Sequence, residues 1–306
     1  MWCRTTIWHT LGSTSRREGV KRKSKACLII ASTVLSAAFF VFILSPTQSE
    51  PTLENKSLSE WLDRYDRYPF PEERTNLVRV LAAIGSNAIP CLLKKASVKD
   101  SGLAQRTKAI LSRAPFLGVR YYPAHMEHDR AVRGLYLLGP LAQSAIPELE
   151  RMLDQDRNAS VAAPCLAGVG PPGIAVLRRK LNHKNPNVRA RVALALGDPQ
   201  LVDESLDKEL VALLRDTDPG VRARAARSLG FRKHSAEMVV PALACLLDDA
   251  NAQVRLDAAW ALGHFGSGAR SQLQALKSKA ANDPDAGVRR FAQIAVRQIA
   301  PENDDH

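Results

Sequence analysis

Aromatic residues make up 6% of this 306-residue chain, and its five cysteines lie far apart. No two of them form a C-x-x-C pair, so neither a zinc site nor a disulfide framework is indicated. We interpret the cysteines as small buried hydrophobic residues on helices. They are Cys3, Cys27, Cys91, Cys165 and Cys245. Alanine and leucine are abundant instead, which suits helices that pack closely on small side chains.

The common catalytic motifs are also missing, since the chain contains no G-x-S-x-G, P-loop or H-E-x-x-H pattern. We therefore expect no catalytic residues, no cofactor and no enzymatic activity. The nearest approach to a metal site is the segment HMEHD, in which His125, Glu127, His128 and Asp129 are ligand types that bind transition metals. A short exposed polar turn explains the same residues, and we favour that interpretation.

Charge is unevenly distributed along the chain, whose formal net charge is +12. Residues 1–26 hold seven Lys or Arg residues against one acid, so about half of the excess lies in a short tail. The 256 residues from Pro51 onward carry 36 basic and 29 acidic groups. This modest excess is compatible with nucleic acid or anionic lipid as a partner, and it does not by itself indicate either.

One uncharged stretch is long enough to cross a membrane. Residues 26–45 read ACLIIASTVLSAAFFVFILS, and a helix of this length spans about 30 Å, the thickness of the hydrocarbon core. The preceding run 16–25 is basic, so we expect residues 1–25 to be a cytoplasmic tail. The C-terminal part then lies outside the cytoplasm, in the periplasm or at the cell surface. A cleaved signal peptide is the alternative, but its apolar run is usually shorter.

A capping helix is predicted after a polar linker over residues 46–56. The segment KSLSEWLDRYDRY predicts a helix over 57–71, because Ser57 and Glu60 have the spacing of a capping box. Its aromatic side chains, beginning with Trp61, share one face. They form either a ligand platform or a cover for the exposed edge of the helices that follow. We favour the cover, since the terminal units of repeat proteins need one.

Four related segments recur in the second half of the chain: NPNVRARVALALG, DPGVRARAARSLG, NAQVRLDAAWALG and DAGVRRFAQIAV. Their valines, at steps of 33, 33 and 34 residues, are Val188, Val221, Val254 and Val288. A fixed period in this range is typical of a repeat protein. We predict an all-α fold, an α–α superhelix over 72–300 that is irregular over 72–183 and regular over 184–300. An acidic tail, 301–306, follows.

Each regular unit opens with a helix cap and continues with a buried face. An Asn or Asp three residues before the valine is the predicted N-cap. Positions 0, +4, +7 and +8 counted from the valine are small or aliphatic and form the predicted core face. A glycine closes the helix in pairs such as Leu196-Gly197, which suggests a left-handed C-cap. In an earlier unit, Pro164 is expected to break or shorten its helix.

Charged residues recur with the same period. An arginine follows each valine, and an aspartate stands five residues before three of the valines. We predict a structural ladder of Asp–Arg pairs that joins adjacent loops, in preference to a basic stripe for phosphates. Its members are Asp216, Arg222, Asp249, Arg255, Asp283 and Arg289. The first regular unit departs from the pattern, because His183 replaces its aspartate.

These units resemble the HEAT-repeat family, in the shorter variant also seen in phycobilin-lyase-type proteins. The resemblance is strong over 184–300 and weaker before it. The arrangement of KSLSEWL followed by GSNAIPCLL also resembles bacterial membrane-anchored HEAT proteins of unassigned role. The resemblance implies a superhelix in which the Val-Arg helices line the concave side.

A membrane-anchored scaffold or adaptor that binds a protein partner in its concave groove is therefore the predicted function. Positions +2, +3 and +6 are expected to face the groove, and Trp and Arg are common anchors at protein interfaces. The predicted contacts are Arg191, Arg224, Arg227, Trp260 and Arg290. One alternative is an enzyme on the same scaffold, of lyase or metal-dependent hydroxylase type. Another is nucleic-acid binding by a basic groove, which a non-cytoplasmic location argues against.

Overall fold

The structure, a computed structural model, describes residues 50–67, 70–98, 122–155 and 159–300. The predicted cytoplasmic tail, the predicted membrane span over 26–45 and the acidic tail over 301–306 lie outside these ranges. Nearly all described residues belong to one compact unit that begins at Pro51.

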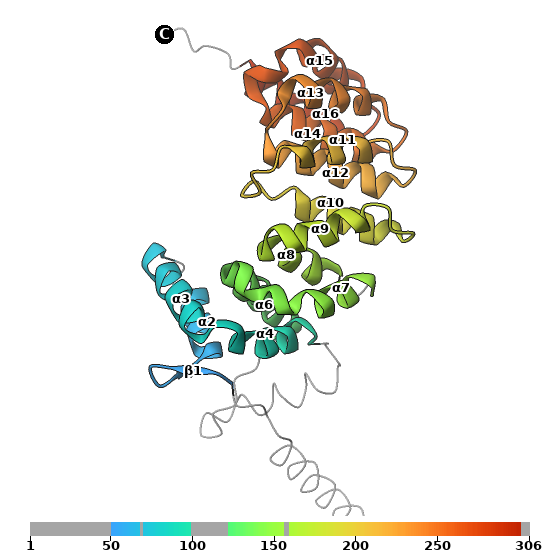
Figure 1. The fold of residues 1–306 in the computed structure, drawn as a ribbon. Helices are drawn as coiled ribbons and strands as arrows, with labels where there is room; N and C mark the ends of the chain where they lie inside the picture. Colours follow the sequence, from blue (N-terminus) through green and yellow to red (C-terminus); the bar gives the residue numbers. More distant parts are fainter. Residues whose placement is uncertain (1–49, 68–69, 99–121, 156–158, 301–306) are drawn as a thin grey trace, which may run out of the picture. The chain divides into compact units, whose positions relative to one another are not determined.

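In this unit, pairs of helices follow one another along the chain (Figure 1), which confirms the all-α prediction. Within each pair, a first helix packs on a second helix. The pairs are α2 (Leu58–Arg67) with α3 (Pro71–Ile84), α4 (Ile89–Ala96) with α6 (Ala124–Leu138), α7 (Ile146–Asp154) with α8 (Ala159–Val169), α9 (Pro171–Lys180) with α10 (Pro186–Leu196), α11 (Ser205–Leu213) with α12 (Pro219–Arg232), α13 (Ala236–Cys245) with α14 (Ala252–His264), and α15 (Leu273–Asn282) with α16 (Ala286–Ile299).

Short 3-10 helices join several of the pairs. They are η1 (Gly85–Ala88), η3 (Gly139–Ala145) and η6 (Gly266–Gln272), while η5 (Leu246–Asp248) lies between the two helices of the pair α13 and α14. The second helices α6, α8, α10, α12, α14 and α16 pack on one another in sequence order, whereas α11 and α13 touch at few points. The described pairs therefore stack as a solenoid in which the second helices approach one another most closely.

The second helices begin where the sequence predicts. The side chains of Asn185, Asp218, Asn251 and Asp285 each accept a hydrogen bond from a backbone N–H of the following turn. The four valines of the repeat are fully buried, as are most of the alanines on the same helical face. Capping thus sets the start of each helix, and burial of this face fixes its rotation toward the core.

The three described cysteines differ in burial, although the sequence suggested that all of them are buried. Cys165 is fully buried in α8, and burial raises the pKa of its thiol. Cys91 is half-buried, while Cys245 is exposed and lies at the end of α13, with its Sγ donating to the carbonyl of Pro241. The prediction of a buried position is wrong for Cys245, because its face of α13 points away from the neighbouring helices.

The glycines that follow the second helices serve two different purposes. Gly85, Gly139 and Gly170 have positive φ angles with ψ of -140°, -130° and -151°, a conformation that favours glycine but differs from the predicted left-handed helical cap. In the regular units the predicted left-handed cap is wrong. Gly230 lies inside α12, and a Cβ there would come within 2.8 Å of the Cα of Ala261 on α14. These glycines permit close helix approach.

Helix α8 also departs from the prediction, because it continues through Pro164 from Ala159 to Val169. Proline removes the hydrogen bond that would reach the carbonyl of Ser160. Both Ser160 and Pro164 line an open hollow, where solvent can hydrate that carbonyl. The helix therefore tolerates the proline without ending.

The N-terminal pair is preceded by a short hairpin of two strands, β1 (Thr52–Leu53) and β2 (Lys56–Ser57), within the predicted linker. The capping box forms, since the Ser57 N–H donates to a Glu60 carboxylate oxygen at 2.8 Å. Trp61 is 4% exposed, and its indole N–H donates to the carbonyl of Leu53 at 3.2 Å. Because the ring is buried, it supports the interpretation of this helix as a cover and not as a ligand platform.

One described segment, Pro71–Ala96, is long and apolar enough to cross a membrane by length and composition. In the fold it is interrupted at Gly85, where α3 ends and η1 begins. Leu77, Leu81 and Leu92 from its two helices lie in the hydrophobic core. This segment therefore forms the core of the first repeats, and the predicted span over 26–45 remains a prediction.

Candidate partner-binding face

The second helices present one shared stripe at positions +3, +6 and +10, counted from the valine of each regular unit. Residues spaced by three or four positions lie on the same side of a helix. We call this stripe the second-helix face, and all of its members except Asp257 are at least partly exposed. It comprises Arg191 and Leu194 of α10 with Asp198 just after that helix, Arg224, Arg227 and Phe231 of α12, Asp257, Trp260 and His264 of α14, and Phe291, Ile294 and Gln298 of α16.

Three rings from two adjacent helices form an aromatic cluster on this face. The ring centroids of Phe231 and Trp260 lie 4.9 Å apart in edge-to-face geometry, and those of Trp260 and His264 lie 3.8 Å apart. Trp260 also packs on Gly230, where a Cβ would come within 2.8 Å of the indole. Phe231 remains 42% exposed. These contacts hold an apolar surface in place before any partner binds.

The predicted contact residues on α12 have different surroundings. The Arg227 guanidinium lies 5.3 Å from the Trp260 ring centroid and donates from Nε to Asp257 at 2.9 Å. Asp257 is 3% exposed and also accepts from Gln253. Arg224 is exposed, and no ion pair or hydrogen bond joins its side chain to the described part of the chain. Arg227 is therefore held in an internal pair, and Arg224 can bind an acidic group.

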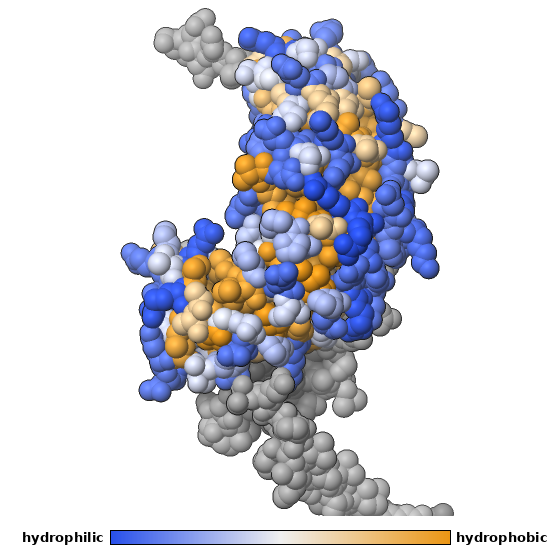
Figure 2. Space-filling view, in the orientation of Figure 1, coloured by the Kyte–Doolittle hydropathy of each residue, from blue (hydrophilic) through white to orange (hydrophobic). Residues whose placement is uncertain are grey.

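A hollow of about 150 Å³ lies on the same side of the stack, between α8 and α10. Its α8 wall consists of small side chains that are apolar except for Ser160, and the predicted contact Arg191 also lines the hollow, with Leu194 and Asp198. In Figure 2, apolar side chains gather over α6 and α8. The hollow is suited to one aliphatic or aromatic side chain of a partner, because most of its wall is apolar.

Tyr136 of α6 reaches across α8 toward the segment that follows α10. Its hydroxyl donates to the Gln200 side chain at 3.0 Å, and a Cβ at Gly168 would come within 2.6 Å of the Tyr136 Cα. Burial and the nearby Asp198 carboxylate raise the pKa of Tyr136 to about 12. The phenol therefore stays neutral and holds the Gln200 side chain by its hydrogen bond.

The fifth predicted contact, Arg290, lies elsewhere. Position +2 faces the following repeat, since the Leu256 side chain would contact a Cβ at Gly287 of α16 at 3.1 Å. Ala223, at the same position of α12, is 4% exposed for the same reason. Arg290 belongs to the last described helix and is exposed at the end of the stack. The prediction that position +2 faces the groove is wrong, because the next repeat covers it.

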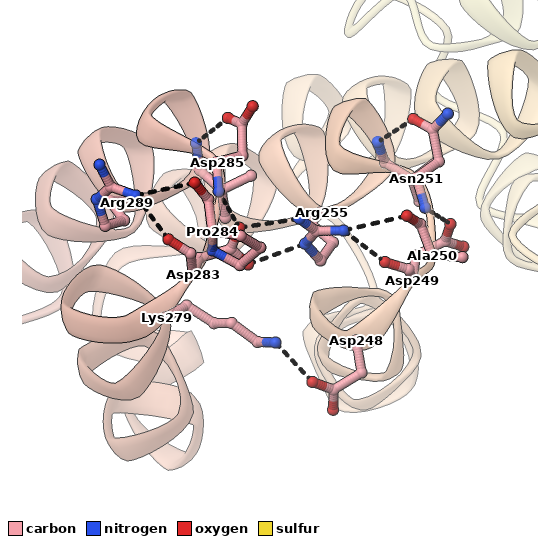
Figure 3. A network of polar contacts seen from close by, with 12 residues as sticks. Asp248, Asp249, Ala250, Asn251, Arg255, Lys279, Asp283, Pro284, Asp285 and Arg289 are labelled. Atoms are coloured by element: carbon pink, nitrogen blue, oxygen red, sulfur yellow. Dashed lines mark hydrogen bonds and ion pairs between the residues drawn. The ribbon is translucent and has the colours of Figure 1, made fainter.

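The Asp–Arg ladder runs along the loops that join first and second helices. Arg255 donates from Nε and Nη2 to the two carboxylate oxygens of Asp283, both at 2.9 Å, while its Nη1 donates to the carbonyl of Asp249 (Figure 3). Arg189 with Asp216 and Arg222 with Asp249 repeat this arrangement. Each arginine thus ties its own loop to the loop of the next repeat.

The ladder also sets local charge states. Burial opposes ionisation of Asp216 and Asp249, but hydrogen bonds from their arginine partners and from a backbone N–H hold the pKa of each below its usual value. The hydrogen bond from Arg255 lowers the pKa of Asp283 in the same way. His183 takes the aspartate position in the first regular unit, where its Nδ1 accepts from the N–H of Asn185. The ladder residues are therefore engaged with one another and leave few groups for a partner.

Two buried arginines have no counterpart in the repeat pattern, and sequence reasoning missed both. Arg232 is 3% exposed and donates to the fully buried Asp207 and to the carbonyls of Leu201 and Asp203. It fastens the long connection between α10 and α11. Arg130 of α6 is fully buried, and it binds the acidic face of α2. In the sequence, these two arginines differ from the others only in that they do not recur with the period of the repeat.

The weak metal candidate does not come together. Glu127 pairs with Lys95 at 2.9 Å, and His128 Nε2 lies 2.8 Å from the carbonyl of Val98. His125 and Asp129 are exposed. Among the described residues, no group of three or more His, Cys, Asp and Glu side chains is placed to hold a metal ion. The HMEHD segment lies on the first turns of α6, so the expectation of a turn is wrong.

Comparison with protein families identifies the repeat. Residues 206–297 match the HEAT repeats family, so this part of the chain is built of HEAT repeats. No curated protein matches the chain.

Several solved structures are similar at low identity. The complex of CpcE and CpcF of phycocyanin lyase from Nostoc sp. PCC7120 is 22% identical with a TM-score of 0.43, over 50% of this chain and 98% of that chain. An engineered protein is 22% identical with a TM-score of 0.43, over 70% of this chain and 99% of that chain. Human deoxyhypusine hydroxylase in complex with glycerol is 21% identical with a TM-score of 0.36, over 80% and 85%. The repeat assignment rests on the family match and the sequence period.

Proposed function

We propose that this HEAT-repeat chain is a membrane-anchored scaffold that binds a protein partner along its second-helix face. The single observation that carries the proposal is the cluster of Phe231, Trp260 and His264, an exposed aromatic surface held in place by its neighbours. Arg224 of α12 and Arg191 of α10 are exposed on the same face. Aromatic side chains flanked by arginines are the residues that dominate binding energy at protein interfaces.

The arrangement favours binding over catalysis. Isolated rings, arginines and a shallow hollow can anchor side chains of a partner, and stacked second helices repeat these anchors along an extended surface. We propose that this surface is the concave side, because the second helices approach one another more closely than the first helices do. The partner would then lie along the stack and contact several repeats at once.

The proposed location is outside the cytoplasm, with residues 26–45 in the membrane. Its support is the uncharged length of that segment and the basic run before it. A membrane anchor would confine the scaffold to one surface and raise its effective concentration for partners there.

The test compares partners captured by proximity labelling of the full chain with those captured by Arg224→Glu/Trp260→Ala. We expect partners of the wild-type chain to be lost from the variant, since each substitution removes an anchor. Phe231→Ala is the milder variant, because that ring is 42% exposed and little core is disturbed. Identical partner sets for all three chains would remove the second-helix face from the proposal.

The matched control is Arg215→Glu/Val202→Ala, which makes similar changes at two exposed positions off the face. Val202 is 83% exposed, and the exposed Arg215 side chain forms no ion pair with the described residues. We expect this variant to retain the wild-type partner set. Equal losses in the control would show that net charge, and not the face, determines capture.

A further inference from the structure

The stack of repeats has a chemically distinct end at α16. In the regular units, positions +2, +5 and +9 face the following repeat and are small in most cases, as in Ala223, Ala226 and Gly230 of α12. In α16 the same positions hold three exposed polar residues, which are Arg290, Gln293 and Arg297. In the regular units the next repeat packs at these positions, so the outer face of α16 differs in chemistry from those of the earlier second helices.

Arg289, the last arginine of the ladder, has no aspartate partner among the described residues. Arg289 donates from Nη1 to the carbonyls of Asp283 and Pro284 at 2.7 and 3.1 Å, as the other ladder arginines do within their own loops. Figure 3 shows its remaining nitrogen atoms directed away from the labelled residues. Within the described part of the chain, no carboxylate pairs with its Nε and Nη2. The side chain is half-buried, so one edge of the guanidinium is held in place and the other is open.

The other ladder arginines show which group the free edge of the Arg289 guanidinium can bind. In each of the three closed rungs, Nε and Nη2 of the arginine hold the two oxygens of one aspartate, at 2.7 to 2.9 Å. A guanidinium that is already fixed loses little freedom when it binds a planar carboxylate by two parallel hydrogen bonds. The pose of Arg289 therefore matches an incoming aspartate or glutamate.

The surrounding charge favours an acidic ligand. Helix α16 contains no acidic residue between Ala286 and Ile299, and Asp283 is already paired with Arg255. Arg290 and Arg297 are both exposed on the outer side of the helix. Three arginines without a described acidic partner thus share one end of the stack and attract negative charge.

We propose that this end of the stack is a second docking site, which binds an acidic peptide segment through a carboxylate held by Arg289. Arg290 and Arg297 attract the neighbouring acidic residues of the same segment. The site is separate from the second-helix face, and it lets the scaffold hold an acidic segment while the face holds another partner.

The test uses fluorescence anisotropy of a labelled hexa-aspartate peptide with the full chain in mild detergent. We expect Arg289→Gln to weaken binding about tenfold, because it removes a bidentate charge-assisted contact. Arg289→Lys keeps the charge but loses the fork, so it should also weaken binding, by about threefold or more. Arg215→Gln removes one exposed charge elsewhere and should change the affinity by less than about twofold.

Two results would overturn the proposal. Equal affinities for Arg289→Gln and Arg215→Gln would show that the peptide binds by net charge, including that of the basic segment 1–26. Tighter binding of a thymidine oligonucleotide, with no difference between Arg289→Lys and wild type, would show a general anion surface for nucleic acid.

A further variant guards against loss of folding, since Arg289 also fastens its own loop. Arg290→Gln/Arg297→Gln changes two exposed side chains and should leave the melting temperature unchanged. We expect it to weaken hexa-aspartate binding and to reduce the dependence of the affinity on salt. An unaltered affinity and salt dependence would remove these two arginines and the charge argument with them.

Discussion

Asp283 binds two groups at once, and this explains why an aspartate recurs at its position. One carboxylate oxygen accepts from the N–H of Asp285 and from Arg255 Nη2, and the other accepts from Arg255 Nε. The residue is 4% exposed. A longer or neutral side chain would lose either the hydrogen bond from the Asp285 N–H or the paired hydrogen bonds from Arg255. The geometry of the loop and the link between repeats therefore depend on the same carboxylate.

The lowered pKa of Asp283 predicts how this link depends on pH. A carboxyl whose folded-state pKa is depressed contributes stability above its unfolded pKa, near 4, and loses it as pH falls through the folded value. We therefore expect Asp283→Asn to destabilise the protein by about 2 kcal/mol at pH 7, because Arg255 loses a charged partner. Urea unfolding should show this difference unchanged down to about pH 5 and shrinking below about pH 4.

Control measurements on Asp248→Asn isolate the effect, because Asp248 pairs with Lys279 but is largely exposed. Its substitution should cost little at any pH. If the difference between wild type and Asp283→Asn stays constant from neutral to acid pH, the carboxylate does not stabilise the fold in its ionised form.

At the scale of helices, the approach between α12 and α14 is set by small residues. Gly230 has an ordinary φ angle, so its role is steric: an added Cβ would lie 2.8 Å from both the Ala261 Cα and the Trp260 ring. Alanine is about 1 kcal/mol better than glycine inside a helix. Here the clash involves backbone, which cannot move without separating the two helices, and overpacking of this kind costs about 1–3 kcal/mol.

We therefore expect Gly230→Ala to lower the free energy of unfolding, against the direction of helix propensity. The matched control is Gly268→Ala in η6, where the added Cβ would find only the Ala236 Cβ at an ordinary 3.8 Å. The control should be neutral or slightly stabilising. Chemical denaturation measures both, and a stabilised Gly230→Ala would contradict the close approach of α12 and α14.

The sequence predicts such elements well where one residue decides the structure locally. The N-caps Asn185, Asp218 and Asn251 and the capping box at Ser57 act within one turn, so their spacing alone reveals them. The role of Gly230 depends on a neighbour about 30 residues away, whereas the glycine of the same Leu-Gly pair after α6 has a positive φ and ends the helix. Local pattern cannot distinguish these two uses of glycine.

Of the candidate face, the period revealed the arginines and Trp260, but not the partners that engage them. Phe231 and His264 share position +10, which the core pattern does not mark, and only stacking brings Phe231 to Trp260. The pairing of Arg227 with Asp257 likewise joins successive repeats. Contacts between units therefore decide which predicted residues are available to a partner.

For the whole stack, contact between neighbouring pairs alone means that a defect in one interface stays local. Gly230→Ala disturbs the α12–α14 interface, so the pairs α13–α14 and α15–α16 should lose part of their support. The pairs from α6 to α10 keep their own interfaces. Hydrogen exchange followed by mass spectrometry should show faster exchange over 236–300 and little change over 124–196. Exchange that rises equally in both ranges would indicate one cooperative body, in which repeats do not unfold separately.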